Sequence, residues 1–252
     1  ITAGFSGAEL ANLLNEAALL AARRHKSLIG PDDISDAYIK VIAGPKKKSM
    51  KIKESEKKKT AYHEAGHAIL AYCMPTQDPV QQISIIPSGN ALGYTLNPPA
   101  EDRYSVYKQE LKEKIAMLLG GRAAEEIIFD EVSTGAANDI QRATDIIRSM
   151  ITVYGMSERF KNMTLGKSGQ GYGSDGPELV REYSEATQQY IDEEIARVMS
   201  ERYDHVLNLL REHKTLLEYI ANTLLEKETM EAKEFNDIIN AETHCKELEN
   251  SA

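Results

Sequence analysis

Tyr62-His63-Glu64-Ala65-Gly66-His67-Ala68-Ile69 is the most informative stretch of this 252-residue chain. Positions four apart on an α-helix point in nearly the same direction, so His63 and His67 are expected to lie side by side and to bind one metal ion. Glu64 would lie beside that ion, where it can take a proton from a water molecule without being a ligand itself. Two imidazoles and one carboxylate leave a fourth coordination position open, which is typical of catalytic zinc. The stretch therefore predicts a helix that carries a zinc site.

The residues around this stretch favour a buried helix over a chance match. Three fixed residues in five positions also occur in helices that bind no metal. Here Pro75 ends the helical pattern, and Gly66 lies inside it although a glycine costs roughly 1 kcal/mol in a helix interior. We therefore expect backbone or substrate to approach Gly66 closely. The apolar face of the helix consists of Ala61, Ala65, Ala68, Ile69 and Tyr72.

Composition and charge set the outer limits. With 42% hydrophobic and 27% charged residues, the chain can bury a sizeable core. No apolar run approaches the roughly 20 residues that span a bilayer, so any membrane anchor is expected to lie outside this chain. Cys73 and Cys245 form neither a disulfide framework nor a zinc-type pair, which fits a reducing compartment. The formal net charge of −9 argues against nucleic acid as the main partner.

Residues 1–44 are expected to form two helices joined by a turn. Ser6 and Glu9 make a capping box at the start of the first helix, and Gly30-Pro31 begins the second, which ends near Gly44-Pro45. No glycine-rich phosphate loop with its lysine occurs anywhere in the sequence. This chain is therefore not expected to bind and hydrolyse a nucleotide by that route.

A lysine-rich segment, residues 45–60, is expected to be a solvated linker and the domain boundary. It holds eight lysines between Lys46 and Lys59, interrupted by Glu54 and Glu56. Such a run also suits attachment to anionic lipid or to nucleic acid, which is the alternative for this segment. A nucleic-acid tether would bind DNA in a strongly salt-dependent way, whereas a solvated linker would not.

Two short segments with strand character follow the histidine helix. Residues 80–86 and 91–96 are separated by Pro87-Ser88-Gly89-Asn90, which predicts a β-hairpin. The edge of such a hairpin can hold an extended peptide through main-chain hydrogen bonds, whatever its side chains; a purely structural hairpin is the alternative. The candidate substrate strand consists of Leu92, Gly93, Tyr94, Thr95 and Leu96.

Beyond residue 100 the sequence is expected to be helical. Glu125 and Glu126 lie within the first of these helices, where they suit either metal ligands or solvated positions. The stretch Ser133-Thr134-Gly135-Ala136-Ala137-Asn138-Asp139 predicts a turn and a helix start. An aspartate in the first turn ordinarily caps the helix or meets its dipole, so the residues alone favour that role for Asp139.

The C-terminal part is expected to hold a glycine-rich loop and three helices. The loop covers residues 166–176, and a long helix runs from about Pro177 to His213. A second helix contains Leu216-Leu217, and the last is capped near Thr229. Their apolar faces are expected to be core and subunit-packing surfaces. The fold class is therefore mainly α, a helical domain with one small β-hairpin or sheet.

Several motifs together carry a family resemblance. They closely resemble motifs of the FtsH family of ATP-dependent, membrane-anchored AAA+ zinc proteases, and the resemblance covers nearly the whole chain. It is weakest from Lys161 to Gly176 and at the C-terminal tail. The motifs are Gly4-Phe5-Ser6-Gly7-Ala8-Glu9-Leu10 through Asn15-Glu16-Ala17-Ala18, His63-Glu64-Ala65-Gly66-His67, Ile85-Ile86-Pro87, Gly120-Gly121-Arg122-Ala123-Ala124-Glu125-Glu126 and Ser133-Thr134-Gly135-Ala136-Ala137-Asn138-Asp139-Ile140.

The resemblance implies roles for the segments. Residues 1–44 would be the C-terminal part of an AAA+ lid subdomain, where Gly7 and Ala8 would lie close to ATP in the full-length protein. Residues 61–244 would be the zinc metalloprotease domain, and residues 245–252 a tail.

The resemblance also implies roles at the metal site. His63, His67 and Asp139 would bind one Zn²⁺ per chain, Glu64 would be the catalytic base, and Glu125 would hold a ligating histidine. For Asp139 this reverses the role that the residues alone favour.

A rival zinc-peptidase pattern, that of the metzincins, does not fit. Leu70 and Cys73 occupy the positions where it requires a glycine and a third histidine. Cys73 follows His67 by six residues, which places it about 240° around a straight helix and directs it away from the metal.

The implied activity is that of a zinc-dependent endopeptidase. It would hydrolyse unfolded or ATP-threaded proteins as the protease part of a quality-control enzyme. The implied partners are unfolded or membrane protein substrates, the other subunits of a homo-hexamer, and a membrane reached through an anchor outside this chain. The full-length protein would lie at the cytoplasmic face of the bacterial inner membrane or the equivalent organelle membrane. The alternative is a helical ring-assembly module whose zinc site is structural or inactive.

Overall fold

Two helices that cross at glycines form the centre of the fold. Helix α3 (Glu54–Cys73) carries both histidines, and α4 (Lys108–Phe129) packs against it. A Cβ atom on Gly66 would lie 2.4 Å from the carbonyl oxygen of Gly120, and a Cβ atom on Gly120 would lie 2.8 Å from that of Gly66. The expected close approach at Gly66 is confirmed, and the neighbour is backbone.

The computed structural model describes residues 2–249 except 48–49, 51, 90, 100, 102, 104, 170–177 and 182; the side chains of residues 166–169, 178–181 and 243–249 are not described. Within these residues it is mainly helical, as expected. No helix among them is long and apolar enough to cross a membrane.

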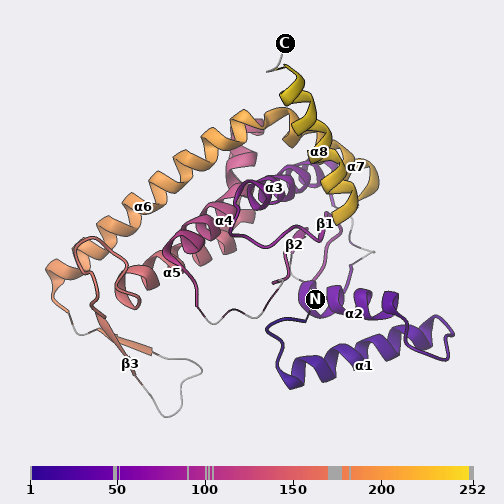
Figure 1. The fold of residues 1–252 in the computed structure, drawn as a ribbon, viewed down its shortest axis with the longest axis horizontal. Coiled ribbons are helices and arrows are strands. Elements are labelled where there is room, and N and C mark those ends of the chain that lie inside the picture. Colours follow the sequence, from indigo (N-terminus) through magenta and orange to yellow (C-terminus); the bar gives the residue numbers. More distant parts are fainter. Residues whose placement is uncertain are drawn as a thin grey trace.

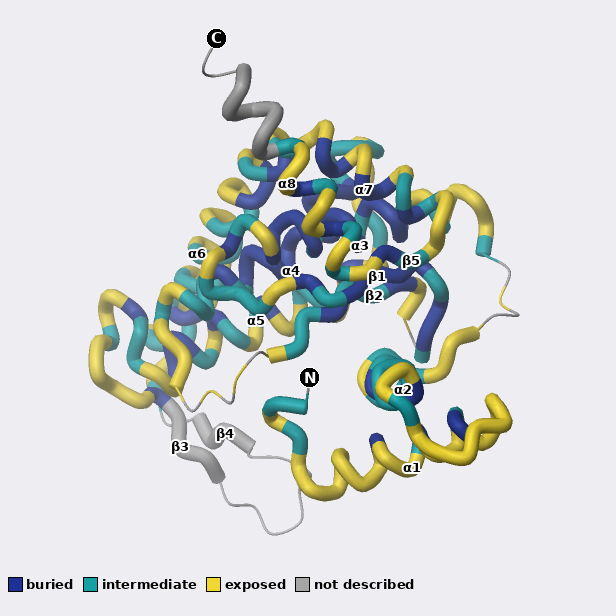
Figure 2. Tube along the Cα trace, turned by 45° about the vertical axis from the view of Figure 1, so that its right-hand side comes forward, coloured by how far each residue is buried: buried dark blue, intermediate teal, exposed yellow. Residues whose placement is uncertain are grey.

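The remaining long helices surround this centre. Helix α5 (Ala137–Thr152) and α6 (Glu185–Glu212) pack on α4, and α7 (Lys214–Lys227) packs on α3 (Figure 1). Buried residues gather along α3, α4 and α7, as Figure 2 shows. The main core therefore lies directly behind the histidine helix.

The expected hairpin exists, but it belongs to a sheet of three strands. Strand β1 (Gln82–Ser84) pairs antiparallel with β2 (Tyr94–Leu96) on one side and with β5 (Thr229–Glu231) on the other. The last helix, expected to be capped near Thr229, is α8 (Ala232–Glu249), and Thr229 itself lies in β5 directly before it. Met230 of β5 lies opposite Ile83, and both side chains are buried. The order β2-β1-β5 leaves β2 at the outer edge.

The N-terminal helix pair follows its sequence signals. Helix α1 (Gly7–Arg23) begins with the capping box of Ser6 and Glu9, and α2 (Pro31–Ala43) lies between Gly30 and Gly44. The pair shares a small core with β2, a contact that the sequence did not predict. That core consists of Leu13, Ala17, Ala37, Tyr38 and Leu96.

Described parts of the lysine-rich segment have regular structure. Lys46 forms an isolated antiparallel β-bridge with Ser88 of the hairpin turn. Residues 54–60 already belong to α3. The helix begins early because Glu54 and Glu56 lie in its first turn, where negative charge is favourable. Two of the lysines form ion pairs, Lys57 with Glu228 at 2.8 Å and Lys59 with Glu131 at 3.2 Å.

Two expectations for residues 166–213 are wrong. Strands β3 (Gly166–Gly169) and β4 (Glu178–Arg181) pair antiparallel where a loop and a helix start were expected. Residues 170–177 of the expected loop lie outside the described part of the chain. Helix α6 begins only at Glu185, because the Ser184 side chain accepts a hydrogen bond from the Thr187 N–H and caps the helix there.

Candidate metal centre

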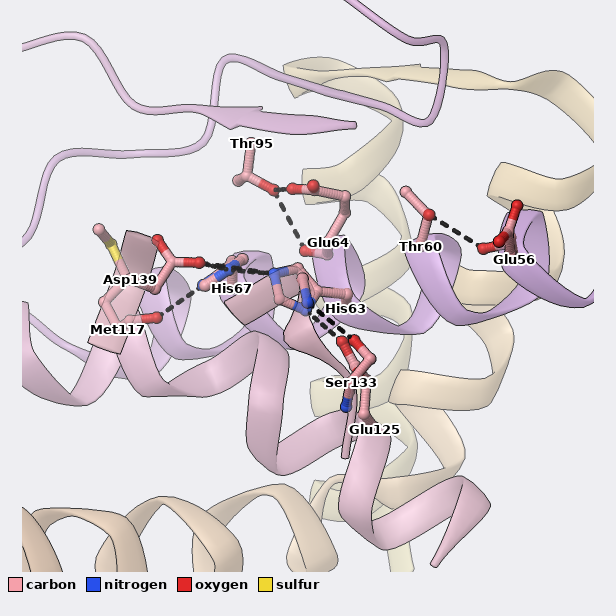
Figure 3. A network of polar contacts seen from close by, with 11 residues as sticks. Glu56, Thr60, His63, Glu64, His67, Thr95, Met117, Glu125, Ser133 and Asp139 are labelled. Atoms are coloured by element: carbon pink, nitrogen blue, oxygen red, sulfur yellow. Dashed lines mark hydrogen bonds and ion pairs between the residues drawn. The ribbon is translucent and has the colours of Figure 1, made fainter. Parts of the chain in front are cut away.

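The two histidines of α3 lie side by side, as their spacing predicts. His63 Nε2 and His67 Nε2 are 3.1 Å apart. Asp139 Oδ2 lies 3.6 Å from the first nitrogen and 3.5 Å from the second. Figure 3 shows the carboxylate facing both rings. The structure thus brings one atom from each of these three residues to a single point.

The spacing of these atoms fits a zinc ion. Zinc bonds of about 2.0–2.1 Å in a tetrahedral arrangement place the ligand atoms about 3.3 Å from one another. The three separations, 3.1, 3.5 and 3.6 Å, lie close to that value. Two imidazoles and a carboxylate are also a typical donor set for catalytic zinc. The residues therefore suit the metal in both chemistry and geometry.

A turn and a short helix bring Asp139 to this point. The Ser133 hydroxyl accepts a hydrogen bond from the Gly135 N–H and starts the 3₁₀-helix η1 (Thr134–Ala136), which leads directly into α5. Asp139 lies in the first turn of α5, as the sequence predicts. Its carboxylate faces the two imidazoles. A carboxylate that only capped the helix would not need to face them.

Hydrogen bonds fix which nitrogen of each ring faces the cluster. His67 Nδ1 lies 2.8 Å from the carbonyl oxygen of Met117, and a carbonyl oxygen can only accept. Nδ1 of His67 therefore carries a proton, and Nε2 is available to a metal. His63 Nδ1 lies 2.7 Å from Glu125 Oε1, which orients that ring in the same way.

A glycine makes room for one of these rings. A Cβ atom on Gly121 would lie 2.4 Å from His63 Cε1 and from Nε2. Sequence reasoning missed the role of Gly121, although the Gly120-Gly121 pair inside a helix was a signal. It also missed Met117, for which no signal existed because the contact is made by the backbone.

The charges around the cluster favour a cation between the rings. Burial lowers the pKa of His63, but Asp139 and Glu125 outweigh this effect and raise the pKa to about 10. Burial raises the pKa of Asp139, but the imidazoles of His63 and His67 hold it well below its usual range. Burial likewise raises the pKa of Glu125, and its hydrogen bonds with His63 and Ser133 lower it. Positive charge is stabilised at this point, as a divalent cation requires.

Glu64 is a buried carboxylate held beside the cluster. Thr95 Oγ1 donates a hydrogen bond to Glu64 Oε2 at 2.8 Å (Figure 3). Burial raises the pKa of Glu64, while the charges of His63 and His67 and the hydrogen bond from Thr95 lower it. A carboxyl group whose pKa is raised by burial suits general acid and base chemistry. The bond from Thr95 was not predicted.

An open cleft of about 920 Å³ gives access to the cluster. Its walls are α3, α4, β2, the start of α5 and the end of α2. All five candidate substrate-strand residues, Leu92 to Leu96, line it. Strand β2 covers only Tyr94–Leu96, and its outer edge carries no further strand of the described sheets.

Three other candidates lie outside the cluster. Glu126 accepts a hydrogen bond from the Tyr203 hydroxyl at 2.5 Å, and Cys73 is half-buried at the end of α3. Gly7 and Ala8 are exposed at the start of α1 and do not line the cleft.

The sequence matches two protein-family models. Residues 50–238 match peptidase family M41, and residues 1–36 match the AAA+ lid domain. The chain belongs to peptidase family M41. The resemblance to the FtsH family is thereby confirmed, and the M41 match spans α3, the sheet and α5.

Relatives of this M41 chain include ATP-dependent zinc metalloproteases. It is 48% identical over 240 residues to FtsH 3 of Symbiobacterium thermophilum, covering 94% of this chain and 38% of the relative. It is 49% identical over 244 residues to FtsH of Pseudothermotoga lettingae, covering 96% and 39%. For FtsH of Thermotoga maritima the identity is 47% over 244 residues, covering 96% and 40%. The chain thus spans about two fifths of the length of these relatives.

Proposed function

We propose that this chain is the zinc-dependent endopeptidase portion of an FtsH-type ATP-dependent protease. The observation that carries the proposal is the meeting of His63, His67 and Asp139 beside Glu64 in a cleft bordered by an outer strand. The names of the relatives, which are zinc metalloproteases, point to the same activity.

In this proposal each side chain at the site has a defined task. His63, His67 and Asp139 hold the metal ion. When bound, the ion supplies Lewis acidity that lowers the pKa of a water molecule toward about 7 and stabilises negative charge on the scissile carbonyl oxygen. Glu64 takes the proton from the attacking water and returns it to the leaving amine, so one carboxylate acts as base and then as acid. Thr95 holds Glu64 in place for both transfers.

We propose that the substrate lies along the outer edge of Leu92 to Leu96 as an added strand. The support is the position of β2, whose outer edge borders the cleft. Main-chain hydrogen bonds depend little on side chains, so cleavage specificity should be broad. Such recognition requires an extended chain, which is why unfolded or threaded proteins, membrane proteins included, are the proposed substrates.

The larger assembly is also a proposal. We infer that residues 1–44 are the end of the ATPase lid, that 45–60 join it to a protease domain at 61–244, and that 245–252 are a tail. We propose that the full-length protein forms a homo-hexamer, binds ATP near Gly7 and Ala8, and is anchored at the cytoplasmic face of the inner membrane or its organelle equivalent. Nucleic acid is not a proposed partner.

Replacement of Glu64 tests the assigned chemistry. In the zinc-loaded Glu64→Gln protein, we expect casein cleavage to fall at least about 10²-fold with zinc still bound, because an amide cannot accept the water proton. Glu54→Gln, an exposed change in the first turn of the same helix, is the matched control and should cleave normally. Normal cleavage by purified Glu64→Gln would contradict the role of Glu64.

Chelation separates this proposal from a structural role for the metal. Loss of cleavage with the fold retained, measured by circular dichroism, supports a catalytic ion. Unfolding on chelation would instead support a helical assembly module with a structural metal.

A further inference from the structure

Arg142 is a cation on the wall of the cleft without a carboxylate partner among the described residues. It lines the cleft and is exposed. Lys59, which also lines the cleft, pairs with Glu131 at 3.2 Å. Among the described residues Arg142 forms no ion pair, so its guanidinium can face whatever occupies the cleft.

The position of Arg142 places this charge near the metal cluster. It follows Asp139 by three residues on α5, and side chains three apart on a helix are neighbours with Cβ atoms about 5–6 Å apart. Asn138 and Asp139 line the same wall. An extended peptide advances about 3.3 Å per residue, so the guanidinium reaches side chains within about three residues of the scissile bond.

A second cation, Lys114, lies close enough to Arg142 for the two charges to interact. Lys114 lies on α4 one turn before Met117, which lines the cleft. Burial lowers the pKa of Lys114, and so does the charge of Arg142, while Asp78 opposes both effects. Lys114 on α4 and Arg142 on the neighbouring α5 therefore repel each other. An anion bound by Arg142 in the cleft would relieve this repulsion.

We propose that Arg142 binds the carboxylate of an acidic substrate side chain close to the scissile bond. This inference rests on the proposed peptidase function and adds a preference to its otherwise broad specificity. The planar guanidinium of arginine matches a carboxylate with two parallel hydrogen bonds, which a lysine cannot offer. The outer edge of β2 fixes the peptide backbone, so a charged group on the facing wall selects among side chains.

Peptide binding in an inactive background tests the proposal without turnover. The probes are peptides with amidated C-termini, each identical except for Glu, Gln or Lys at one of the six positions around the cleaved bond. The binding protein is zinc-loaded Glu64→Gln. We expect a peptide with Glu at a position on one side of that bond to bind about 2- to 5-fold tighter than the matching Gln peptide, which is the range for exposed ion pairs. The preference should shrink with added salt because Arg142 is exposed. A Gln peptide with a free C-terminus tests whether a terminal carboxylate serves equally.

Charge variants identify the residue. Arg142→Gln should abolish the preference for Glu, and Arg142→Glu should replace it with a preference for Lys. The control is Arg148→Gln on the same helix, which should keep the preference. Arg148 is exposed, pairs with Asp145 at 3.5 Å and does not line the cleft.

The outcomes distinguish this subsite from the peptidase proposal. A preference for Glu that survives Arg142→Gln, or no preference in any protein, overturns the subsite. Cleavage by the unmodified chain with no preference for Glu also overturns the subsite but supports the peptidase function. Binding that prefers Glu through Arg142, without cleavage by the zinc-loaded chain, supports the subsite and contradicts the peptidase function.

Discussion

His63 Nδ1 lies 2.7 Å from Glu125 Oε1, and this contact joins α3 to α4 at the metal centre. The second oxygen of the same carboxylate accepts a hydrogen bond from the Ser133 N–H at 3.0 Å. Ser133 begins the turn that delivers Asp139. One buried carboxylate therefore positions His63 directly and Asp139 indirectly, through the backbone of Ser133.

Glu125→Gln is expected to keep zinc but to bind it more weakly. An amide can accept from only one of the two donors, because its NH₂ group would face the N–H of the other. Loss of such a partner typically costs 10–100-fold in metal affinity or activity. Competition with a chelator measures the affinity. The control is Glu126→Gln, the next residue on α4, whose partner is Tyr203; equal zinc affinity in both variants would show that Glu125 does not position a ligand.

Asp139→Asn is expected to lose most of its zinc and all peptidase activity. Two imidazoles alone bind zinc weakly, and the anionic third ligand also balances the charge of the ion. Metal analysis of the purified protein measures the effect, with Asp145→Asn on the exposed side of the same helix as a control. Cys73→Ser should leave zinc content and peptidase activity nearly unchanged. Stoichiometric zinc and normal activity in Asp139→Asn, with zinc lost on replacing Glu125 or Cys73, would assign the third ligand elsewhere.

The sequence was sufficient where a local pattern determines a local structure. The i, i+4 spacing of His63 and His67 placed both rings on one side of α3, and the Ser6 capping box placed the start of α1. Fold class and family also followed from such patterns. Each of these features depends on residues within one or two helical turns.

Local pattern was insufficient where a distant segment decides the structure. Strand β5 is three residues long, too short to show a period, and it exists because β1 pairs with it. Asp139 has the same local sequence context whether it caps a helix or faces a metal. Met117 acts through its carbonyl oxygen, which no side chain reveals.

Gly66→Ala is expected to destabilise the protein by about 1–3 kcal/mol, as overpacking of a tight core does. The new Cβ atom would lie 2.4 Å from the Gly120 carbonyl oxygen, so α3 and α4 must separate. Urea unfolding measures the loss in the free energy of unfolding. Gly7→Ala at the start of α1 is the control, because a Cβ atom there meets nothing within 4 Å. Equal stability of the two variants would contradict the close helix crossing.

Asp33 is expected to make the stability of the N-terminal helix pair depend on pH. This fully buried carboxylate accepts hydrogen bonds from the Gly30 N–H at 3.0 Å, from Lys26 Nζ at 3.0 Å and from Arg24 Nη1 at 2.6 Å. The bonds from Gly30 and Lys26 lower its pKa to about 2, with a further contribution from Arg24 and against the effect of burial.

The sign of this effect follows from the unfolded chain, in which an aspartate has a pKa of about 3.9. Because the folded pKa is lower, ionised Asp33 stabilises the fold fully above about pH 4, and this contribution is lost as the pH falls toward about 2. Hydrogen exchange of the α2 amides between pH 5 and 2 measures the local stability. We expect Asp33→Asn to be less protected at pH 5 and to approach the unmodified chain near pH 2, whereas the exposed Asp32→Asn should follow the unmodified chain throughout. A constant difference between Asp33→Asn and the unmodified chain across this range would show that ionisation of Asp33 contributes nothing.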